Sequence, residues 1–335
     1  MGFLLCDNEK TMQTEKWQPS ASIDVLKQRA LVLQKIRAFF ALRDVLEVDT
    51  PALSHATVTD EHLHSFSTQF IHPFAPKAAT LYLQTSPEFA MKRLLSAGSG
   101  AIYQICKSFR NEETGRFHNP EFTMLEWYRP GFNHLQLMSE IDELIQTVLG
   151  CETAERVTYQ DSFKQHLNCD PLTATLTEIK TLANQYGYGE LAANESNKDT
   201  LLMLLFSQHV EPQIGRDRPC FVMDFPASQA ALAKISPTNP LVAERFELYF
   251  RGVELANGFH ELTDGAEQRR RFEGDNTKRQ NNGQDIMPID ENFIAAINAG
   301  LPNCAGVALG IDRLLMLALD CSRIEQVIAF ENSRA

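Results

Sequence analysis

The sequence predicts an α+β fold in which an antiparallel sheet is flanked by helices. Two observations carry this prediction. Strand-like segments follow one another as hairpins, without the regular βαβ alternation that a parallel sheet requires. Helical patterns are gathered before, between and after these hairpins. The 335 residues, 44% of them hydrophobic, are also enough to bury a large core without disulfides.

Residues 1–19 are expected to be a disordered lead-in. Residues 20–335 are expected to form a single domain, which is long enough to be a catalytic domain. The first helix is indicated by apolar residues in steps of three and four, which place them on one helical face. These are Leu26, Ala30, Leu33, Ile36 and Phe40. A strand is predicted over residues 45–50, where Leu46 and Val48 alternate with carboxylates, and Pro51 ends it.

A second helix and a long hairpin follow. A short strand at residues 81–83 precedes Ser86, a plausible N-cap, with Pro87 as the first helical residue and Gly98 as the stop. Strands are predicted over residues 101–108 and 121–128, with a charged loop between them.

The second half of the chain also contains helix and strand patterns. Helices are predicted over 135–149, 176–186 and 199–210, and strands over 220–225, 246–250 and 253–259. A polar segment, 263–290, precedes a helix at 291–298. A small-residue strand, 306–310, then enters an apolar helix from Asp312.

Charge and cysteine usage narrow the function. With 31 Lys and Arg against 43 Asp and Glu, the net charge is −12. This charge argues against a protein whose main role is to bind the phosphate backbone of a nucleic acid. The seven cysteines are odd in number and form no C-x-x-C pair, which favours free thiols and a cytoplasmic location. No apolar run is long enough to span a membrane, so no membrane partner is expected.

Three motif interpretations fail. Gly98 and Gly100 resemble a dinucleotide fingerprint, but Tyr103 replaces its third glycine. Lys107-Ser108 resembles the end of a P-loop, but Cys106 stands where glycine is required. His62 and His64 lack further ligands at zinc-site spacing, and a solvated loop explains them better.

The hairpin carries the first segment that suggests chemistry. Phe109-Arg110-Asn111-Glu112 follows one strand, and Glu126 and Tyr128 share a face of the returning strand because side chains alternate. An Arg offers a fork to a phosphate, while carboxylates and a tyrosine suit an ammonium group. On spacing alone, a hairpin with surface ion pairs fits about equally well.

A second segment carries two glutamates seven residues apart. With a two-residue turn at Arg251-Gly252, Glu247 and Glu254 reach the same face of adjacent strands. Two such carboxylates among aromatic residues repel each other unless a cation lies between them, and Mg²⁺ prefers oxygen ligands. A solvated acidic edge is the alternative.

Together these residues resemble the class II aminoacyl-tRNA synthetases. The segment at Arg110 resembles motif 2 of that family, Gly306-Val-Ala-Leu-Gly310-Ile-Asp312-Arg313 resembles motif 3, and the helix and strand ending at Pro51 resemble motif 1. The three occur in the right order over residues 20–330, nearly the whole chain. The resemblance implies the class II synthetase catalytic core, an antiparallel sheet flanked by helices.

Within that class the chain is similar to the lysyl-tRNA synthetase branch, and closest in pattern to its free-standing paralogs, the elongation factor P–(R)-β-lysine ligases. Trp17-Gln-Pro-Ser-Ala-Ser-Ile23, Phe225-Pro-Ala-Ser-Gln229 and the segment from Glu254 to Leu262 carry this likeness. Only about twenty residues precede motif 1, so no anticodon-binding domain is expected. Met12 is an alternative native start, a hypothesis that N-terminal mass spectrometry tests.

The resemblance implies an AMP-forming ligase that uses ATP and Mg²⁺, activates (R)-β-lysine and passes it to a lysine of elongation factor P. Arg110 and Arg313 would be catalytic. Besides these two arginines, the resemblance implies ATP contacts for Asn111, Glu112, His118, Asn119, Phe122, Glu254, Leu255 and Gly310. Phe122 and Arg313 would sandwich the adenine, and Glu247 and Glu254 would bind Mg²⁺.

The implied amino-acid pocket consists of Ser86, Glu88, Glu126, Tyr128, Asn257, Glu261 and Ala308. The glutamates would bind the two amines, and Asn257 would face the carboxylate. Lysyl-tRNA synthetases have Gly where this chain has Ala308, so a methyl group is expected beside the pocket.

Two other functions remain open: a lysyl-tRNA synthetase core that activates α-lysine, and an inactive regulatory paralog. The charge of −12 speaks against stable tRNA binding. The presence of Arg110, Glu254 and Arg313 speaks against inactivity. Like class II cores in general, the chain is expected to form a homodimer through the motif 1 helix and strand, with Leu46 and Val48 as its apolar face.

Overall fold

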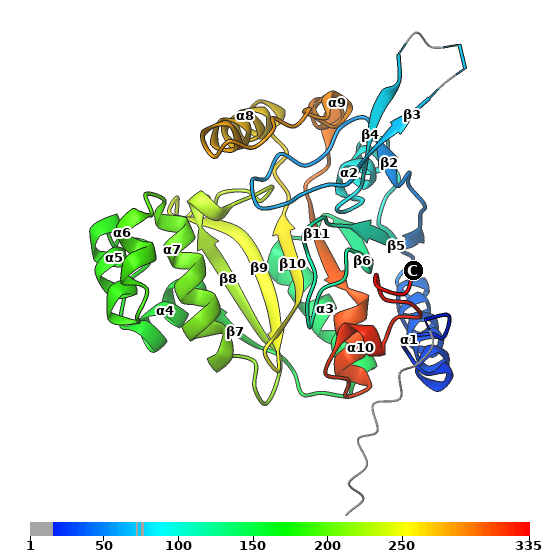
Figure 1. The fold of residues 1–335 in the computed structure, drawn as a ribbon, viewed down its shortest axis with the longest axis horizontal. Coiled ribbons are helices and arrows are strands. Elements are labelled where there is room, and N and C mark those ends of the chain that lie inside the picture. Colours follow the sequence, from blue (N-terminus) through cyan, green and yellow to red (C-terminus); the bar gives the residue numbers. More distant parts are fainter. Residues whose placement is uncertain (1–15, 72, 75–76) are drawn as a thin grey trace, which may run out of the picture.

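In the computed structural model, which describes residues 16–71, 73–74 and 77–335, the fold centres on an eight-stranded sheet (Figure 1). The strand order is β1-β5-β6-β11-β10-β9-β8-β7. Neighbouring strands are antiparallel except at the two edges, where β1 pairs with β5 and β7 with β8 in parallel. The α+β prediction is confirmed. The strands are β1 (Leu46–Glu47), β5 (Ile102–Phe109), β6 (Glu121–Pro130), β7 (Glu155–Thr158), β8 (Cys220–Pro226), β9 (Val242–Phe250), β10 (Val253–His260) and β11 (Cys304–Gly310).

A second, three-stranded sheet stands beside β5, in the order β2-β4-β3. It comprises β2 (Leu53–Ser54), β3 (Ser67–Phe70) and β4 (Ala79–Leu83). The strand predicted over 45–50 is shorter than expected, because only Leu46 and Glu47 pair with a neighbour as a ladder. Val48 donates one further backbone hydrogen bond, to the Tyr103 carbonyl.

Three helices pack with the main sheet to form the largest hydrophobic core. They are α1 (Ile23–Ala41), α3 (His134–Leu149) and α10 (Ile311–Ala318). Phe40 of α1 stacks on Tyr103 of β5, and Trp127 of β6 lies edge-on to the same phenylalanine. The predicted first helix is confirmed, with Ser22 as its N-cap.

The remaining helices gather at two other places. Near the β7–β8 edge, a second core is formed by α4 (Tyr159–Leu167), α5 (Leu176–Gln185), α6 (Gly189–Asn194) and α7 (Lys198–Leu205), with a π-helical turn at Phe206–Val210 and a 3-10 turn at Glu211–Gln213 (Figure 1). A third core joins α2 (Glu88–Ser96), α8 (Gly265–Asn281) and α9 (Glu291–Gly300). Six of these helices and strands were not predicted individually: α4, α6, α8, β2, β3 and β7.

One predicted boundary is wrong, and one segment contains a helix that was not predicted. Helix α2 begins at Glu88 with Pro87 at the N-cap position, since Ser86 uses its hydroxyl for a contact across the site while accepting the Glu88 N–H. The polar segment 263–290 contains α8, a helix without an apolar stripe. It is held instead by the Asp264 N-cap and by ion pairs of Glu267 with Arg270 and Arg271.

The lead-in predicted over residues 1–19 falls mostly outside the described residues. Its last part, 16–19, forms a turn, and the Gln18 carbonyl accepts a hydrogen bond from Arg334. The six cysteines within the described part of the chain are all free thiols. Among the described residues, no helix has both the length and the apolar character needed to cross a membrane.

Candidate active site

One large cavity of about 880 Å³ opens on the face of the main sheet opposite α3. All seven residues expected to recognise an amino acid line it. They are Ser86, Glu88, Glu126, Tyr128, Asn257, Glu261 and Ala308, together with Arg110 and Glu247. These residues therefore come from four strands, one helix and three connecting segments.

Strand register explains why these side chains meet. Glu126 of β6 lies opposite Ala308 of β11, which lies opposite Asn257 of β10, which lies opposite Glu247 of β9. Directly paired residues in antiparallel strands point to the same face. The four side chains thus form one row across the sheet, and Tyr128 heads the next row, opposite Gly306.

Glu126 is the centre of a buried hydrogen-bonded group. Ser86 Oγ donates to one oxygen of Glu126 at 2.5 Å, and the Tyr128 hydroxyl donates to the other at 2.7 Å. Both Glu126 and Tyr128 are 2% exposed. Burial, with the charge of Glu88 added to it, raises the pKa of Glu126 to about 7.

Lys92 of α2 completes this pocket, and sequence reasoning missed it. Its ammonium group lies 2.6 Å from Glu88 Oε1 and 2.6 Å from Glu261 Oε2, and the side chain is 1% exposed. Burial alone lowers the pKa of Lys92, but Glu261 and Glu88 together raise it above its ordinary value. Burial raises the pKa of Glu261 to about 8, against the opposing effect of Lys92. The pocket therefore holds three glutamates and one lysine.

Gly306 lets two of these side chains approach the sheet. A Cβ atom at this position would lie 2.2 Å from Tyr128 Cε1 and 2.5 Å from Glu261 Oε1. Tyr128 and Glu261 are both buried, so a side chain at 306 would push them away from these positions. Any larger residue at 306 would displace the residues expected to bind the amines.

A second group of carboxylates lies along β9 and β10. The Arg251-Gly252 turn has positive φ at both residues, as a two-residue hairpin requires. A bulge between Glu254 and Ala256 shifts the register beyond it, so that Asn257 lies opposite Glu247. Glu254 is nevertheless close enough for its charge to raise the pKa of buried Glu247, in addition to burial itself.

A third carboxylate in this group, Glu211, was also missed. It follows the π-helical turn and lines the cavity. Burial and the charges of Glu254 and Glu247 raise the pKa of Glu211 to about 7. On the other side, Arg245 and the Tyr249 hydroxyl donate hydrogen bonds to Glu247.

Motif 2 places Arg110 at the edge of the cavity. Its guanidinium lies over the Phe122 ring, 5.2 Å from the centroid, and 3.6 Å from Glu113. Its Nε is buried without a hydrogen-bond partner among the described residues. A donor in this condition is available to an anionic ligand.

Arg313 contacts the motif 2 loop from the start of α10. It lies 2.6 Å from His118 Nε2 and donates to the Glu254 carbonyl at 2.9 Å and the Phe117 carbonyl at 3.3 Å. Burial and Arg313 lower the pKa of His118. These contacts bring together Arg313, His118 and Glu254, three of the residues expected to bind ATP.

The other residues that are expected to contact ATP lie farther from one another or make fewer contacts. Asn111 and Glu112 are exposed in the loop, and the Asn119 side chain contacts the Glu121 carbonyl and the Asn332 N–H. Leu255 is 2% exposed in the main core, so only its main chain is available to a ligand. Gly310 has only Arg313 within reach of a Cβ atom.

Comparison with known proteins identifies the fold and its branch. The sequence model of the family described as "tRNA synthetases class II (D, K and N)" matches residues 13–334. The chain belongs to this family. It is 62% identical over 317 residues to an elongation factor P–(R)-β-lysine ligase of Photobacterium profundum, covering 95% of this chain and 98% of that protein.

Ligases with the same name in Vibrio cholerae and Pseudoalteromonas translucida are 60% and 58% identical, each over 97% of this chain and the whole of the relative. The chain is thus a member of the elongation factor P–(R)-β-lysine ligase family, within the class II synthetases. The resemblance found from the motifs is confirmed, as is its assignment to the ligases.

Proposed function

We propose that this protein activates (R)-β-lysine with ATP, forming a β-lysyl-adenylate and pyrophosphate, and transfers the β-lysyl group to a lysine ε-amine of elongation factor P. The observation that carries the proposal is the pocket of Glu88, Glu126 and Glu261 around Lys92, beside Arg110. The names of its near full-length relatives support the same substrate and acceptor.

The charge of the pocket suits a substrate with two amines. Lys92 contacts Glu88 and Glu261, so the three glutamates outnumber their one cation by two, and Glu126 forms no ion pair with a described residue. Burying two ammonium groups is favourable only where such partners are present. Asn257 Oδ1, buried without a hydrogen-bond partner among the described residues, adds a polar contact in the same row.

Adenylation requires positioning rather than a general base, because a carboxylate is already a nucleophile. The substrate carboxylate attacks the α-phosphorus, and the bond to pyrophosphate breaks. Arg110 would neutralise charge that develops on the α-phosphate, with its unpartnered Nε as one donor. Phe122 and Arg313 would hold the adenine between a ring and a guanidinium.

Class II ligases of this kind use ATP, typically together with Mg²⁺, and the oxygen donors of Glu247 and Glu254 fit that ion. When bound, Mg²⁺ neutralises charge on the phosphates. The charges of Glu254 and Glu247 act on Glu211, which adds a third negative charge to this end of the cavity. Arg245 balances the charge of Glu247.

In the second step the acceptor ε-amine attacks the acyl carbon of the adenylate. An amide bond forms, AMP leaves with the electron pair of the broken bond, and the amine loses a proton to solvent. We also propose that this takes place in the cytoplasm, where a translation factor acts.

The deciding experiment measures the intact mass of elongation factor P after incubation with this protein, ATP and either lysine isomer. We expect an added β-lysyl group with (R)-β-lysine, a much smaller addition with α-lysine, and none without ATP. Equal addition of both isomers, or of neither, would contradict the proposal. A Glu126→Gln variant is the matched control, since it removes a carboxylate charge at constant size.

Two alternatives have their own tests. A lysyl-tRNA synthetase core would shift tRNA in a binding assay that weakens with salt, whereas we expect no stable tRNA complex at a net charge of −12. An inactive paralog would show no pyrophosphate exchange. The presence of Arg110, Glu254 and Arg313, with Arg313 3.6 Å from Glu254, favours an active enzyme.

We further propose a homodimer formed through α1 and β1. β1 is an edge strand, and Leu46 on it is 56% exposed. Val48 contributes less than expected, because it packs against the core around α2 and α9. Light scattering at micromolar concentration should give the dimer mass, and a Leu46→Asp variant should dissociate. A monomeric wild type would refute this part.

A further inference from the structure

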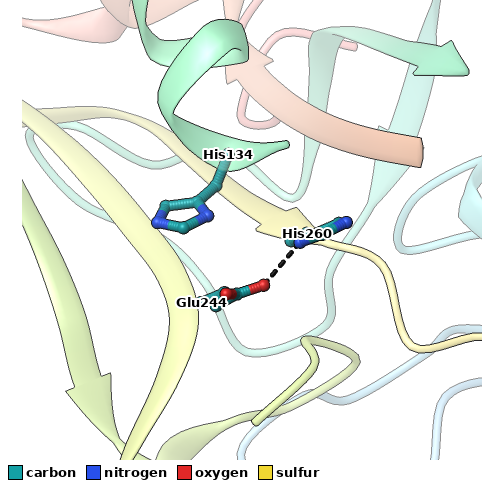
Figure 2. Close-up of side chains that lie close together, drawn as sticks. All are labelled: His134, Glu244 and His260. Atoms are coloured by element: carbon teal, nitrogen blue, oxygen red, sulfur yellow. Dashed lines mark hydrogen bonds and ion pairs between the residues drawn. The ribbon is translucent and has the colours of Figure 1, made fainter. Parts of the chain in front are cut away.

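A second cluster of ligating side chains lies behind the active-site strands. His134 is the first residue of α3, Glu244 lies on β9, and His260 is the last residue of β10. One ligand atom from each lies within 4.8 Å of the others. Figure 2 shows the three side chains converging from a helix and two strands. This cluster is the only group of three such residues found within the described residues.

The cluster is separate from the cavity. Arg245 and Glu247 of β9 line the cavity, and Glu244 lies one residue before Arg245. In the same way His260 lies between Phe259 and Glu261, which both line the cavity. Since side chains alternate along a strand, Glu244 and His260 point to the opposite face, where α3 packs. None of the three residues belongs to the site described above.

Hydrogen bonds already orient His260 as a ligand. Its Nδ1 lies 2.5 Å from Glu244 Oε2, and its Nε2 lies 2.9 Å from Asn303 Oδ1. Lys234 donates to the same Asn303 oxygen, which fixes that oxygen as an acceptor toward His260. Histidines that bind metal through one nitrogen commonly donate the other N–H to such an oxygen.

His134 supplies the independent observation. It is 8% exposed, and its Nδ1 is buried with no hydrogen-bond partner among the described residues. Leaving a buried nitrogen unsatisfied is unfavourable, and a His260–Glu244 ion pair alone does nothing to relieve this. An ion bound between the three residues would provide the missing partner.

We propose that His134, Glu244 and His260 bind a Zn²⁺ ion, with water as the fourth ligand. Two imidazoles and one carboxylate are a common zinc donor set. Zinc ligands stand about 3.3 Å apart when each bond is about 2.0 Å, so Glu244 and His260 would separate slightly as the ion replaces the proton between them. Asp224 lies near Glu244 and Arg156 near His134, one charge of each sign.

The bound ion would cross-link the start of α3 to β9 and β10. These two strands carry Glu247, Asn257 and Glu261 on their other face. Zinc would therefore act as a structural support for the site rather than as a participant in the reaction. The inference does not depend on the proposed function, because its tests measure metal binding and thermal stability.

The experiment titrates chelator-treated, full-length protein with Co²⁺ and then Zn²⁺, in excess Mg²⁺ so that hard oxygen sites are filled. We expect one Co²⁺ per chain with tetrahedral absorption and no sulfur charge-transfer band, displacement by Zn²⁺, and a melting temperature that rises with Zn²⁺. Absence of stoichiometric binding, or a sulfur band from the cysteines, would overturn the proposal.

Substitutions of the proposed ligands test where the ion binds. His134→Phe and Glu244→Gln should weaken Co²⁺ binding by about 100-fold or more, and Asn303→Ala by about 10–100-fold. His55→Ala, at an exposed histidine, should bind like the wild type. Circular dichroism checks that each variant is folded, and Glu244→Gln, which keeps its size and a hydrogen bond, stands in if His134→Phe unfolds. Unchanged binding in Glu244→Gln would overturn the proposal.

Discussion

The two halves of the candidate active site are built differently. On the amine side, Glu126, Tyr128, Lys92 and Glu261 are each 2% exposed or less and are joined by hydrogen bonds and ion pairs. On the nucleotide side, Arg110, Glu112, His118 and Asn119 lie in a loop, and several are exposed. Glu112 in that loop also has a positive φ of 70°.

The difference indicates how each half would achieve selectivity. Discriminating two lysine isomers requires atoms held to a fraction of an ångström, which packed strands and buried ion pairs provide. Binding a triphosphate relies more on charge, which acts over longer distances and tolerates a loop. We therefore expect mutations to affect stability on the amine side and catalysis alone on the nucleotide side.

The largest effect on catalysis is expected at Arg110. The variant Arg110→Ala should reduce pyrophosphate exchange by about 10³-fold or more, because the guanidinium acts where charge develops. Its thermal unfolding should be unchanged, since its ion pair with Glu113 is long and partly exposed. Exchange within about threefold of wild type would show that motif 2 is assigned wrongly.

On the amine side, Lys92→Met tests whether the pocket also holds the fold together. Removing one partner of a buried ion pair costs about 3–5 kcal/mol, since the remaining carboxylates stay buried. Lys164→Met is the matched control, because Lys164 and Asp170 form a pair that is about half exposed on the lysine side. It should cost less than about 1 kcal/mol.

Denaturant unfolding of both variants decides this comparison. Excess (R)-β-lysine should restore more stability to Lys92→Met than to the wild type, because its ammonium groups can pair with the buried carboxylates that have lost Lys92. Equal losses in the two lysine variants would mean that the amine side is no more rigid than the surface.

Much of the sheet could be predicted because its hairpins carry local signals. The apolar alternation of 101–128 and the Arg251-Gly252 turn are short-range features, and both appear where expected. Helix α8 gave no such signal, because its residues are polar on most faces and only Phe272 and a few others are buried. The bulge at Leu255 depends on tertiary packing and shifts Asn257 opposite Glu247.

The candidate site shows the same limit. Glu126 and Tyr128 were expected on one face from period-two spacing, and the hydrogen bond between them confirms it. Lys92 falls in the helix predicted after Ser86, and Glu211 directly follows the helix predicted over 199–210, but no motif marks either position. Each becomes significant only through contacts far along the chain, which no spacing rule reveals. The histidine cluster was missed for the same reason.

A smaller effect on catalysis is expected from pH. It tests whether Glu126, on the amine side of the site, binds an ammonium group. Because the pKa of Glu126 is raised to about 7, this residue is neutral below that pH and loses its attraction for an ammonium group. The value of kcat/KM for (R)-β-lysine should fall by at least about tenfold per pH unit as pH drops below 7, and level off only above about pH 8, where Glu261 is ionised as well. Exchange assays at constant ionic strength give this profile.

The Glu126→Gln variant should have low activity at every pH, and its kcat/KM should no longer show the dependence on pH that is due to Glu126. The KM for ATP should not follow the same profile, since Glu126 belongs to the amine side. A wild-type profile that is flat from about pH 6 to about pH 8 would contradict the assignment of Glu126 as an ammonium ligand.

The smallest expected effect concerns one methyl group. Ala308 lies between Glu126 and Asn257 in the row of cavity-facing residues, so its methyl borders the pocket. In β-lysine the amine is displaced by one carbon, about 1.5 Å along the chain. A methyl group makes no hydrogen bond, but it can crowd one placement of the substrate backbone and leave the other free. Such shape effects amount to about 1–3 kcal/mol.

Ala308→Gly should therefore raise kcat/KM for α-lysine relative to (R)-β-lysine by about tenfold, the lower end of that range, while the KM for ATP stays nearly constant. Steady-state adenylation with both isomers measures the ratio. If Ala308 only packs β11, both substrates lose activity together and the ratio stays the same. That result would leave selectivity to the carboxylates, because the rigid half of the site would then discriminate by charge placement and not by shape.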